Sequence, residues 1–320
     1  MRPTVLILSS LYDFSTDLIA LRLREMQIPF LRLNREQISE YRICMDPIGQ
    51  SLTVRGFDLN MVIGPDLRSI FFRQPVFLRN TPGTALTPEQ QLERSQWAAF
   101  LRSLSIFDGV SWMNFPQATY LAECKPYQLL VAHRCGLRVP RSIVGNDAQA
   151  IASAFRMGMV IKSLDTVLLR EDNDCLFTYT TITDSNDLTD ETVRQVPMLA
   201  QELLSHKTDI RVTVAGDRLF TVKILCDGKG VDGDWRIIPK QRLSYETIEL
   251  PPEISRACYA ITRQLELQFA AIDLVETPAG FVFIEVNPTG EWGWISGPSR
   301  QIDMAIANWL SAPSAATVSQ

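Results

Sequence analysis

The chain contains 320 residues, 46% of them hydrophobic, so it is long enough to bury the cores of two or three subdomains. Its 31 basic and 36 acidic residues give a net charge of −5, which offers no polycationic face to a phosphate backbone and argues against nucleic acid as a partner. The opening apolar run is too short for a signal peptide, and no apolar stretch approaches the roughly 18–20 residues of a membrane span, so we expect a cytoplasmic protein outside membranes.

Residues 1–115 alternate short apolar runs with helical patterns, which is typical of an α/β layer. A helix capped by Thr16 and Asp17 is predicted to run to about residue 26. A capping box at residues 87–90, with proline at the first helical position, predicts a long helix towards residue 104. The strands predicted in this part are residues 4–9, 29–33, 52–54, 61–63 and 70–73.

Residues 116–200 form a second predicted unit. It opens with a helical stretch that carries Lys125 and stops at Gly136, where a left-handed backbone is easily accommodated. An extended piece after Pro140, a helix over residues 148–157 and a buried strand over residues 159–162 follow. The pattern of residues 165–181 leaves two alternatives open, a hairpin or a mobile loop.

Residues 201–320 show the clearest pattern. Two hairpins with a helix between them are predicted, with strands over residues 210–214, 218–225, 269–276 and 281–287 and the helix over residues 251–267. Strict alternation along the last strand places Phe281, Phe283, Glu285 and Asn287 on one face.

Three oxygen ligands are predicted to converge on the second hairpin. Its pairing brings Asp273 within about one residue of the position opposite Glu285, and Asn287 lies on the same face. Because Mg²⁺ prefers carboxylates, waters and substrate phosphates, this cluster predicts a Mg²⁺-nucleotide site. Alternatives remain for single residues: Glu285 alone fits the solvated face of a strand, and Asn287, before Pro288, fits a residue that closes a turn.

Several basic residues are candidates for binding phosphate. Lys162 ends a buried strand and Lys125 lies on the preceding helix, although each lysine taken singly is more often a solvated surface residue. Arg211 and Arg236 carry guanidinium groups that match phosphate and carboxylate oxygens, or they form surface Asp–Arg pairs. Residues 201–204, Gln-Glu-Leu-Leu, predict either a hinge strand whose backbone binds an adenine edge, or a helix start or linker.

Metal and nucleophile motifs of other kinds are missing from the sequence. Its six cysteines contain no C-x-x-C pair and it has only two histidines, so neither a zinc site nor a disulfide framework is predicted. Activation of a carboxylate by phosphorylation requires no Ser–His or Cys–His pair, because catalysis then consists of positioning and electrostatic stabilisation.

The order and spacing of several motifs resemble the ATP-grasp superfamily of carboxylate–amine ligases. These motifs are Lys162, residues 201–204, residues 209–212, Asp273 and Glu285-x-Asn287-Pro288. Five further motifs resemble, more narrowly, the graspetide (microviridin-type) synthetases, which are ATP-grasp maturases of ribosomal peptides. They lie at residues 16–17, 31–34, 71–75, 234–236 and 287–294. The resemblance implies a mixed α/β and α+β fold. An N-terminal α/β domain (residues 1–115) would precede two α+β subdomains (residues 116–200 and 201–320) that clamp ATP.

The resemblance also implies residue roles. Two Mg²⁺ ions would be bound by Asp273, Glu285 and Asn287, and the ATP phosphates would be held by Lys125 and Lys162. The adenine pocket would be lined by Gln201, Glu202 and Leu204, with Asp209 near the ribose, and the γ-phosphate and acyl phosphate would face Arg211 and Arg236. Many ATP-grasp enzymes have a glycine-rich loop after the phosphate-binding lysine, whereas residues 163–170 contain no glycine. Graspetide synthetases also lack a clean version of this loop.

The implied reaction converts an Asp or Glu side chain of a leader-bearing precursor peptide to an acyl phosphate. A Ser or Thr hydroxyl or a Lys amine of the same peptide then attacks it, forming an ω-ester or ω-amide macrocycle and releasing ADP and phosphate. Two alternatives stay open: an intermolecular ligase that adds an amino acid to a peptide or protein, and a nucleotide-binding protein without catalysis. Because dimers are common in that family, a homodimer is a further expectation.

Overall fold

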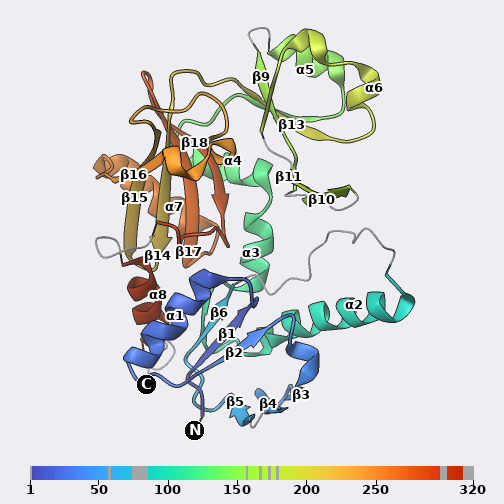
Figure 1. Ribbon diagram of the computed structural model, residues 1–320, viewed down its shortest axis with the longest axis vertical. Coiled ribbons are helices and arrows are strands. Elements are labelled where there is room, and N and C mark those ends of the chain that lie inside the picture. Colours follow the sequence, from blue (N-terminus) through green and yellow to red (C-terminus); the bar gives the residue numbers. More distant parts are fainter. Residues whose placement is uncertain are drawn as a thin grey trace.

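The computed structural model describes residues 2–56, 59–73, 86–155, 158–165, 168–171, 174–177, 180–295 and 301–312. Figure 1 shows an N-terminal layer at the bottom, a large C-terminal sheet on the left and a smaller unit at the upper right. Two residues of the predicted 71–75 motif, Gln74 and Pro75, and the predicted end of the helix at residues 156–157 lie outside the described residues.

A four-stranded parallel sheet forms the centre of the N-terminal layer, in the order β2-β1-β6-β7. Side chains of β1 alternate between its two faces: Val5 and Ile7 pack with the helices of one face, and Leu6 and Leu8 pack with the other. The elements of this sheet and its helical face are β1 (Val5–Ser9), α1 (Phe14–Glu25), β2 (Phe30–Asn34), β6 (Ser69–Phe72), β7 (Ser111–Met113) and α8 (Ile302–Ser311).

The opposite face is covered by the long helix α2 and a three-stranded antiparallel sheet. These elements are η1 (Ile38–Glu40), β3 (Arg42–Asp46), β4 (Ser51–Gly56), β5 (Leu59–Ile63), α2 (Pro88–Ser103) and η2 (Leu104–Ile106). The predicted capping box is confirmed, because the Gln90 amide donates to the Thr87 hydroxyl (3.3 Å) and the Thr87 amide donates to the Gln90 side chain (3.1 Å).

The middle of the chain forms a second sheet in the order β12-β9-β13-β8, with its own core of Ile151, Phe155, Met159 and Ala200. The strands β10 and β11 pair as an antiparallel hairpin, which confirms that alternative. The elements are α3 (Pro116–Ala122), α4 (Lys125–Arg134), β8 (Ser142–Gly145), α5 (Ala148–Ala154), β9 (Met159–Lys162), β10 (Leu168–Glu171), β11 (Asp174–Phe177), β12 (Thr181–Thr183), η3 (Ser185–Asp187), α6 (Asp190–Val193) and β13 (Met198–Glu202).

The C-terminal sheet has five antiparallel strands in the order β16-β15-β14-β17-β18. Both predicted hairpins are confirmed, and their turns contain Gly216 (φ 60°) and Gly280 (φ 104°), a backbone region that favours glycine. The elements are β14 (Thr208–Ala215), β15 (Arg218–Cys226), η4 (Trp235–Ile237), η5 (Lys240–Arg242), β16 (Leu243–Thr247), α7 (Pro252–Gln264), β17 (Phe269–Thr277) and β18 (Gly280–Asn287).

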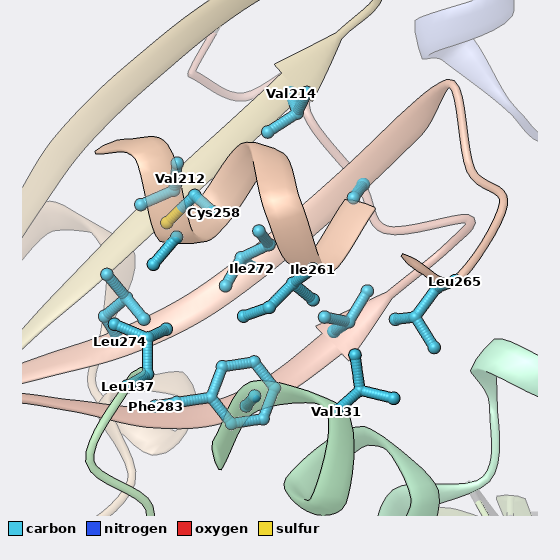
Figure 2. Close-up of a cluster of buried hydrophobic side chains, with 14 of the residues drawn as sticks. Val131, Leu137, Val212, Val214, Cys258, Ile261, Leu265, Ile272, Leu274 and Phe283 are labelled. Atoms are coloured by element: carbon cyan, nitrogen blue, oxygen red, sulfur yellow. The ribbon is translucent and has the colours of Figure 1, made fainter. Parts of the chain in front are cut away.

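Helices α4 and α7 cover one face of this sheet, as Figure 2 shows. Val131 of α4 and Ile261 of α7 pack with Ile272 of β17 and Phe283 of β18, all of them buried. Because the apolar side chains fill this face, polar side chains of β14, β17 and β18 project from the opposite face.

The last helix returns to the N-terminal layer, where α8 packs beside α1. Arg22 of α1 contacts Asp303 of α8 at 2.6 Å, and the Ser69 hydroxyl of β6 donates to the Leu310 carbonyl at 2.6 Å. The predicted domain boundaries near residues 115 and 200 stay a prediction. None of the helices in the described ranges is both long enough and apolar enough to cross a membrane.

We expect Phe283→Ala to lower the free energy of unfolding by about 3–5 kcal/mol, because it leaves a cavity beneath β17 and β18. Urea denaturation monitored by circular dichroism measures the change. Tyr12→Ala removes a side chain that is 83% exposed and should change stability by less than about 0.5 kcal/mol. Equal losses in the two variants would contradict this packing.

Candidate active site

A pocket opens between the four-stranded middle sheet and the five-stranded C-terminal sheet. One wall comes from the ends of β9 and β13, the other from β14, β17 and β18, and residues 233–236 border it. All the predicted site residues except Arg211 and Asn287 line this pocket: Lys125, Lys162, Gln201, Glu202, Leu204, Asp209, Arg236, Asp273 and Glu285. Residues widely separated in the sequence therefore meet in one cavity.

Two carboxylates lie opposite each other in this pocket. Asp273 on β17 pairs directly with Glu285 on β18, and both side chains are mostly buried. Like charges directly opposite one another destabilise a sheet unless cations compensate them. The pair is therefore suited to a cation.

A β-bulge in β18 sets the direction of Glu285 and corrects the predicted alternation. Asp273 pairs with Glu285 but the next residue, Leu274, pairs with Phe283, so Ile284 is an extra residue. Phe281 and Phe283 consequently pack on the helical core together with Val286, whereas Ile284 and Glu285 line the pocket. The prediction that Phe281, Phe283 and Glu285 share a face is wrong, because a bulge shifts the period of two by one residue.

The Asn287 side chain closes a turn. Its Oδ1 accepts hydrogen bonds from the Thr289 amide (3.0 Å) and the Thr289 hydroxyl (3.4 Å). It shares the face of β18 with Glu285, two residues away, but it does not line the pocket. Its role as a metal ligand stays a prediction.

Arg211 forms a buried ion pair with Asp273 from the neighbouring strand. Its Nε lies 2.6 Å from Asp273 Oδ1 and its Nη2 lies 3.4 Å from Oδ2, while Nη1 donates to the Glu291 carbonyl at 3.3 Å. Burial raises the pKa of Asp273 above its usual value, and repulsion from Glu285 adds to this, although Arg211 opposes it. The Asp–Arg pair that Arg211 forms is therefore interior rather than on the surface.

Arg236 is held by Asp234. Its Nε and Nη2 lie 2.9 and 2.8 Å from the two oxygens of Asp234, and its Nη1 lies 3.9 Å from Glu285 Oε1. Burial alone would lower the pKa of Arg236, but its hydrogen bonds to Asp234 and the charge of that carboxylate raise it above the usual value. The guanidinium group of Arg236 therefore stays charged beside Glu285.

Two lysines complete the cationic surroundings of Glu285. Burial lowers the pKa of Lys162, although Glu285 and Asp273 oppose the shift, and Lys125 donates to the Leu164 carbonyl at 3.2 Å. Burial would raise the pKa of Glu285, but the charges of Lys162, Arg236 and Lys125 hold it below its usual value. A carboxylate kept ionised among cations is suited to bind a metal–phosphate complex.

The other end of the pocket combines apolar walls with main-chain groups. Residues 198–202 form strand β13, which rules out a helix start, and Gln201 donates to the Ser142 hydroxyl at 3.0 Å. Leu203 and Leu204 follow this strand, and their main-chain groups have no hydrogen-bond partner among the described residues. Buried or pocket-lining main-chain groups need such partners, and the edge of a planar base is one.

Sequence reasoning missed Lys207, which lines the pocket and contacts Asp209 at 2.6 Å. Burial raises the pKa of Asp209, and the charge of Lys207 opposes the shift. The only sequence signal was the separation of two residues between this lysine and Asp209. In the described part of the chain, no three His, Cys, Asp or Glu side chains group as a metal centre, so the candidate centre consists of two acids and an amide.

Comparison with known proteins identifies the family of this domain. Residues 125–310 match the family described as the RimK-like ATP-grasp domain. No curated protein matches the sequence.

Three solved structures share the fold along nearly the whole chain. A RiPP-associated ATP-grasp ligase from Chryseobacterium gregarium, in complex with ADP and a leader and core peptide, is 20% identical, with a TM-score of 0.84 and 98% of each chain covered. The macrocyclase MdnC of Microcystis aeruginosa MRC, bound with precursor peptide MdnA, is 21% identical, with a TM-score of 0.82 and coverage of 96% of this chain and 98% of that one. The macrocyclase MdnB of the same organism is 22% identical, with a TM-score of 0.75 and coverage of 97% and 99%.

The ion pair between Asp234 and Arg236 predicts a pH dependence of stability. Burial would raise the pKa of Asp234, but its bonds to Arg236 hold the pKa below the usual value. The pair therefore stabilises the fold above the unfolded-state pKa of about 3.9, and this contribution disappears as the pH falls through the lower folded-state pKa.

We expect Asp234→Asn to lower the free energy of unfolding by a constant amount from about pH 8 to about pH 5, and by progressively less below about pH 4. Denaturant titrations across this range measure the difference. Asp227→Asn breaks an exposed pair with Arg242 and should have little effect at any pH. A difference between the parent and Asp234→Asn that grows on acidification would contradict the assignment.

Proposed function

The chain belongs to the RimK-like ATP-grasp family, and from this premise we propose that it is an ATP-dependent carboxylate ligase that crosslinks a ribosomal precursor peptide. The observation that carries the proposal is the pair Asp273 and Glu285, opposed across two strands and surrounded by Arg211, Arg236, Lys162 and Lys125. Such a site is suited to Mg²⁺ and to phosphoryl transfer rather than to nucleophilic catalysis by the protein.

The nucleotide would lie along the pocket. Its adenine edge would meet the free main-chain groups of Leu203 and Leu204 beside Gln201 and Glu202, with the ribose near Asp209 and the phosphates towards Lys162 and Lys125. Asp273 and Glu285 fit Mg²⁺ because their mutual repulsion is relieved by a divalent cation. Asn287 would join them by releasing Thr289, and two ions would need this third ligand.

The chemistry follows from the weakness of a carboxylate as an electrophile. A peptide Asp or Glu carboxylate oxygen attacks the γ-phosphorus of ATP, ADP leaves, and an acyl phosphate forms. A Ser or Thr hydroxyl, or a Lys amine, then attacks the acyl carbon, phosphate leaves, and the nucleophile loses a proton. Mg²⁺, when bound, neutralises phosphate charge.

The arginines of this chain have distinct positions for that chemistry. Arg236 borders the pocket and is oriented by Asp234, so its Nη1, which lies 3.9 Å from Glu285 Oε1, would face the charge that develops during transfer. Arg211 holds the Asp273 carboxylate in place and its Nη1 donates to the Glu291 carbonyl, and we propose that its guanidinium also faces the γ-phosphate of bound ATP. Both arginines hold positive charge in a fixed position near the reacting groups. Such positioning and electrostatic stabilisation provide most of the rate enhancement in phosphoryl-transfer enzymes.

A peptide substrate is supported by two of the solved structures that share this fold. The ligase from Chryseobacterium gregarium binds a leader and core peptide, and MdnC binds its precursor MdnA. Intramolecular ω-ester or ω-amide formation is the outcome we propose here. The intermolecular alternative uses the same acyl phosphate with an amino acid as the nucleophile.

Mass spectrometry of a co-expressed precursor tests this function. Short neighbouring open reading frames rich in Thr, Ser, Asp and Glu should yield peptides that lose the mass of one water molecule for each crosslink. A gain equal to an amino acid residue would favour the intermolecular ligase. Unchanged mass with every neighbouring peptide, despite ADP binding, would favour a non-catalytic nucleotide-binding protein.

Glu285→Gln keeps the size of the side chain and removes its charge. We expect Mg²⁺ then to lose its ability to strengthen ADP binding, and peptide-dependent ADP release to fall at least about a hundredfold, since a metal contributes several kcal/mol to such transition states. Isothermal titration calorimetry with and without EDTA measures the first effect. Glu276→Gln breaks the Lys223–Glu276 pair outside the pocket and should behave as the parent. Parent-like Mg²⁺ dependence in Glu285→Gln would exclude Glu285 as a ligand.

A further inference from the structure

Arg73 is a buried charge that the nucleotide site does not explain. It follows β6 in the N-terminal layer, is 4% exposed, and lies outside the pocket. Its Nε lies 3.2 Å from Asp13 Oδ2, its Nη2 donates to Glu291 Oε1 at 2.7 Å, and its Nη1 donates to the Thr289 carbonyl. Two of these three partners belong to the 287–294 segment, which follows directly on the strand of Glu285.

Glu291 links this arginine to the proposed catalytic arginine. Its carboxylate accepts from Arg73 through one oxygen and from the Ser15 hydroxyl of α1 through the other, the latter at 2.7 Å. Its main-chain carbonyl accepts from Arg211 Nη1 at 3.3 Å. One residue is therefore held by the N-terminal layer through its side chain and holds Arg211 through its backbone.

Trp294 provides a second contact from the same segment. The Arg211 guanidinium carbon lies 5.7 Å from the centre of its ring, within the range of a cation–π interaction. The ring also lies 5.6 Å from that of Trp235, the neighbour of Arg236, and 4.8 Å from that of Tyr245. Among the described residues, the Arg211 guanidinium thus contacts Asp273 and two residues of the 287–294 segment, Glu291 and Trp294.

Close packing on both sides fixes this segment. A Cβ atom at Gly290 would overlap the methyl group of Ala271 on β17, and one at Gly293 would overlap Phe14 and Ser15 at the start of α1. Trp292 between them is fully buried in the core shared by α1, β1 and α8. The segment has little freedom to shift unless the N-terminal layer shifts with it.

We infer that Arg73 and Glu291 are positioning residues for Arg211, so that the N-terminal layer sets the direction of a catalytic guanidinium through the 287–294 segment. The inference rests on the role of Arg211 in the proposed function. It explains why Arg73 of the 71–75 motif is buried and why the 287–294 segment is fixed, although neither Arg73 nor this segment lines the pocket. A forked guanidinium suits Arg73 because it donates to the Thr289 carbonyl and to Glu291 while its charge faces the Asp13 carboxylate.

The test measures how much the γ-phosphate contributes to nucleotide binding, by calorimetric titration with Mg²⁺–AMPPNP and with Mg²⁺–ADP. Arg211→Lys should lower the affinity for AMPPNP at least about tenfold and leave the affinity for ADP within about twofold, since an ammonium cannot replace the forked hydrogen bonds of a guanidinium to the γ-phosphate. Glu291→Gln and Arg73→Lys should show the same selective loss. In an Arg211→Lys background, Glu291→Gln should have almost no further effect, because it acts through Arg211.

Two matched controls separate positioning from general loosening. Arg22→Lys weakens another contact between α1 and the C-terminal part of the chain, the pair with Asp303, which does not touch Arg211. Glu276→Gln breaks an ion pair on the same sheet. Both should bind AMPPNP and ADP as the parent does, and thermal unfolding shows whether their stability changes match those of the test variants.

Two results would overturn the inference, and they are distinguishable. If Arg211→Lys weakens AMPPNP binding but Glu291→Gln and Arg73→Lys do no more than the controls, or if their effects add fully to that of Arg211→Lys, the positioning role is wrong and the role of Arg211 stands. If Arg211→Lys leaves AMPPNP binding unchanged, the role of Arg211 in the proposed function fails, and the inference fails with it.

Discussion

The site depends on two carboxylates that face each other across β17 and β18. Asp273 and Glu285 repel one another, and burial disfavours the charge of each, so the pair persists only because cations surround it. These cations come from four places in the fold: Arg211 from β14, Arg236 from η4, Lys162 from β9 and Lys125 from α4. Neither sheet contains the full set, and the pocket therefore exists only where the two sheets meet.

The local parts of this arrangement could be predicted from the sequence. The capping box of α2, the strand that ends at Lys162 and the two C-terminal hairpins are set by neighbouring residues, and the short turn between β17 and β18 brings Asp273 within one residue of the position opposite Glu285. The motif order and spacing also identified the ATP-grasp fold. These features can be predicted because the local secondary-structure propensities of the residues agree with the periodicity of the hydrophobic side chains.

The remaining parts depend on contacts or irregularities that have no local signature. The bulge at Ile284 reverses the faces of Phe281 and Phe283 relative to Glu285, and nothing in the alternating pattern announces it. Arg73 and Glu291 are separated by 218 positions, so their ion pair became visible only when β6 and the 287–294 segment were placed together. Likewise, the Asp–Arg pair of Arg211 could not be distinguished in sequence from a surface pair, because only the fold shows that it is buried. The homodimer stays a prediction.

A crystal structure of the chain with Mg²⁺ and AMPPNP tests the central claim most directly, since that claim is a statement about where a nucleotide and its metal bind. We expect the adenine between β13 and the start of β14, the phosphates between Lys125 and Lys162, and Mg²⁺ on Asp273 and Glu285 at about 2.0–2.1 Å. A nucleotide bound elsewhere, or a metal that contacts neither carboxylate, would contradict it.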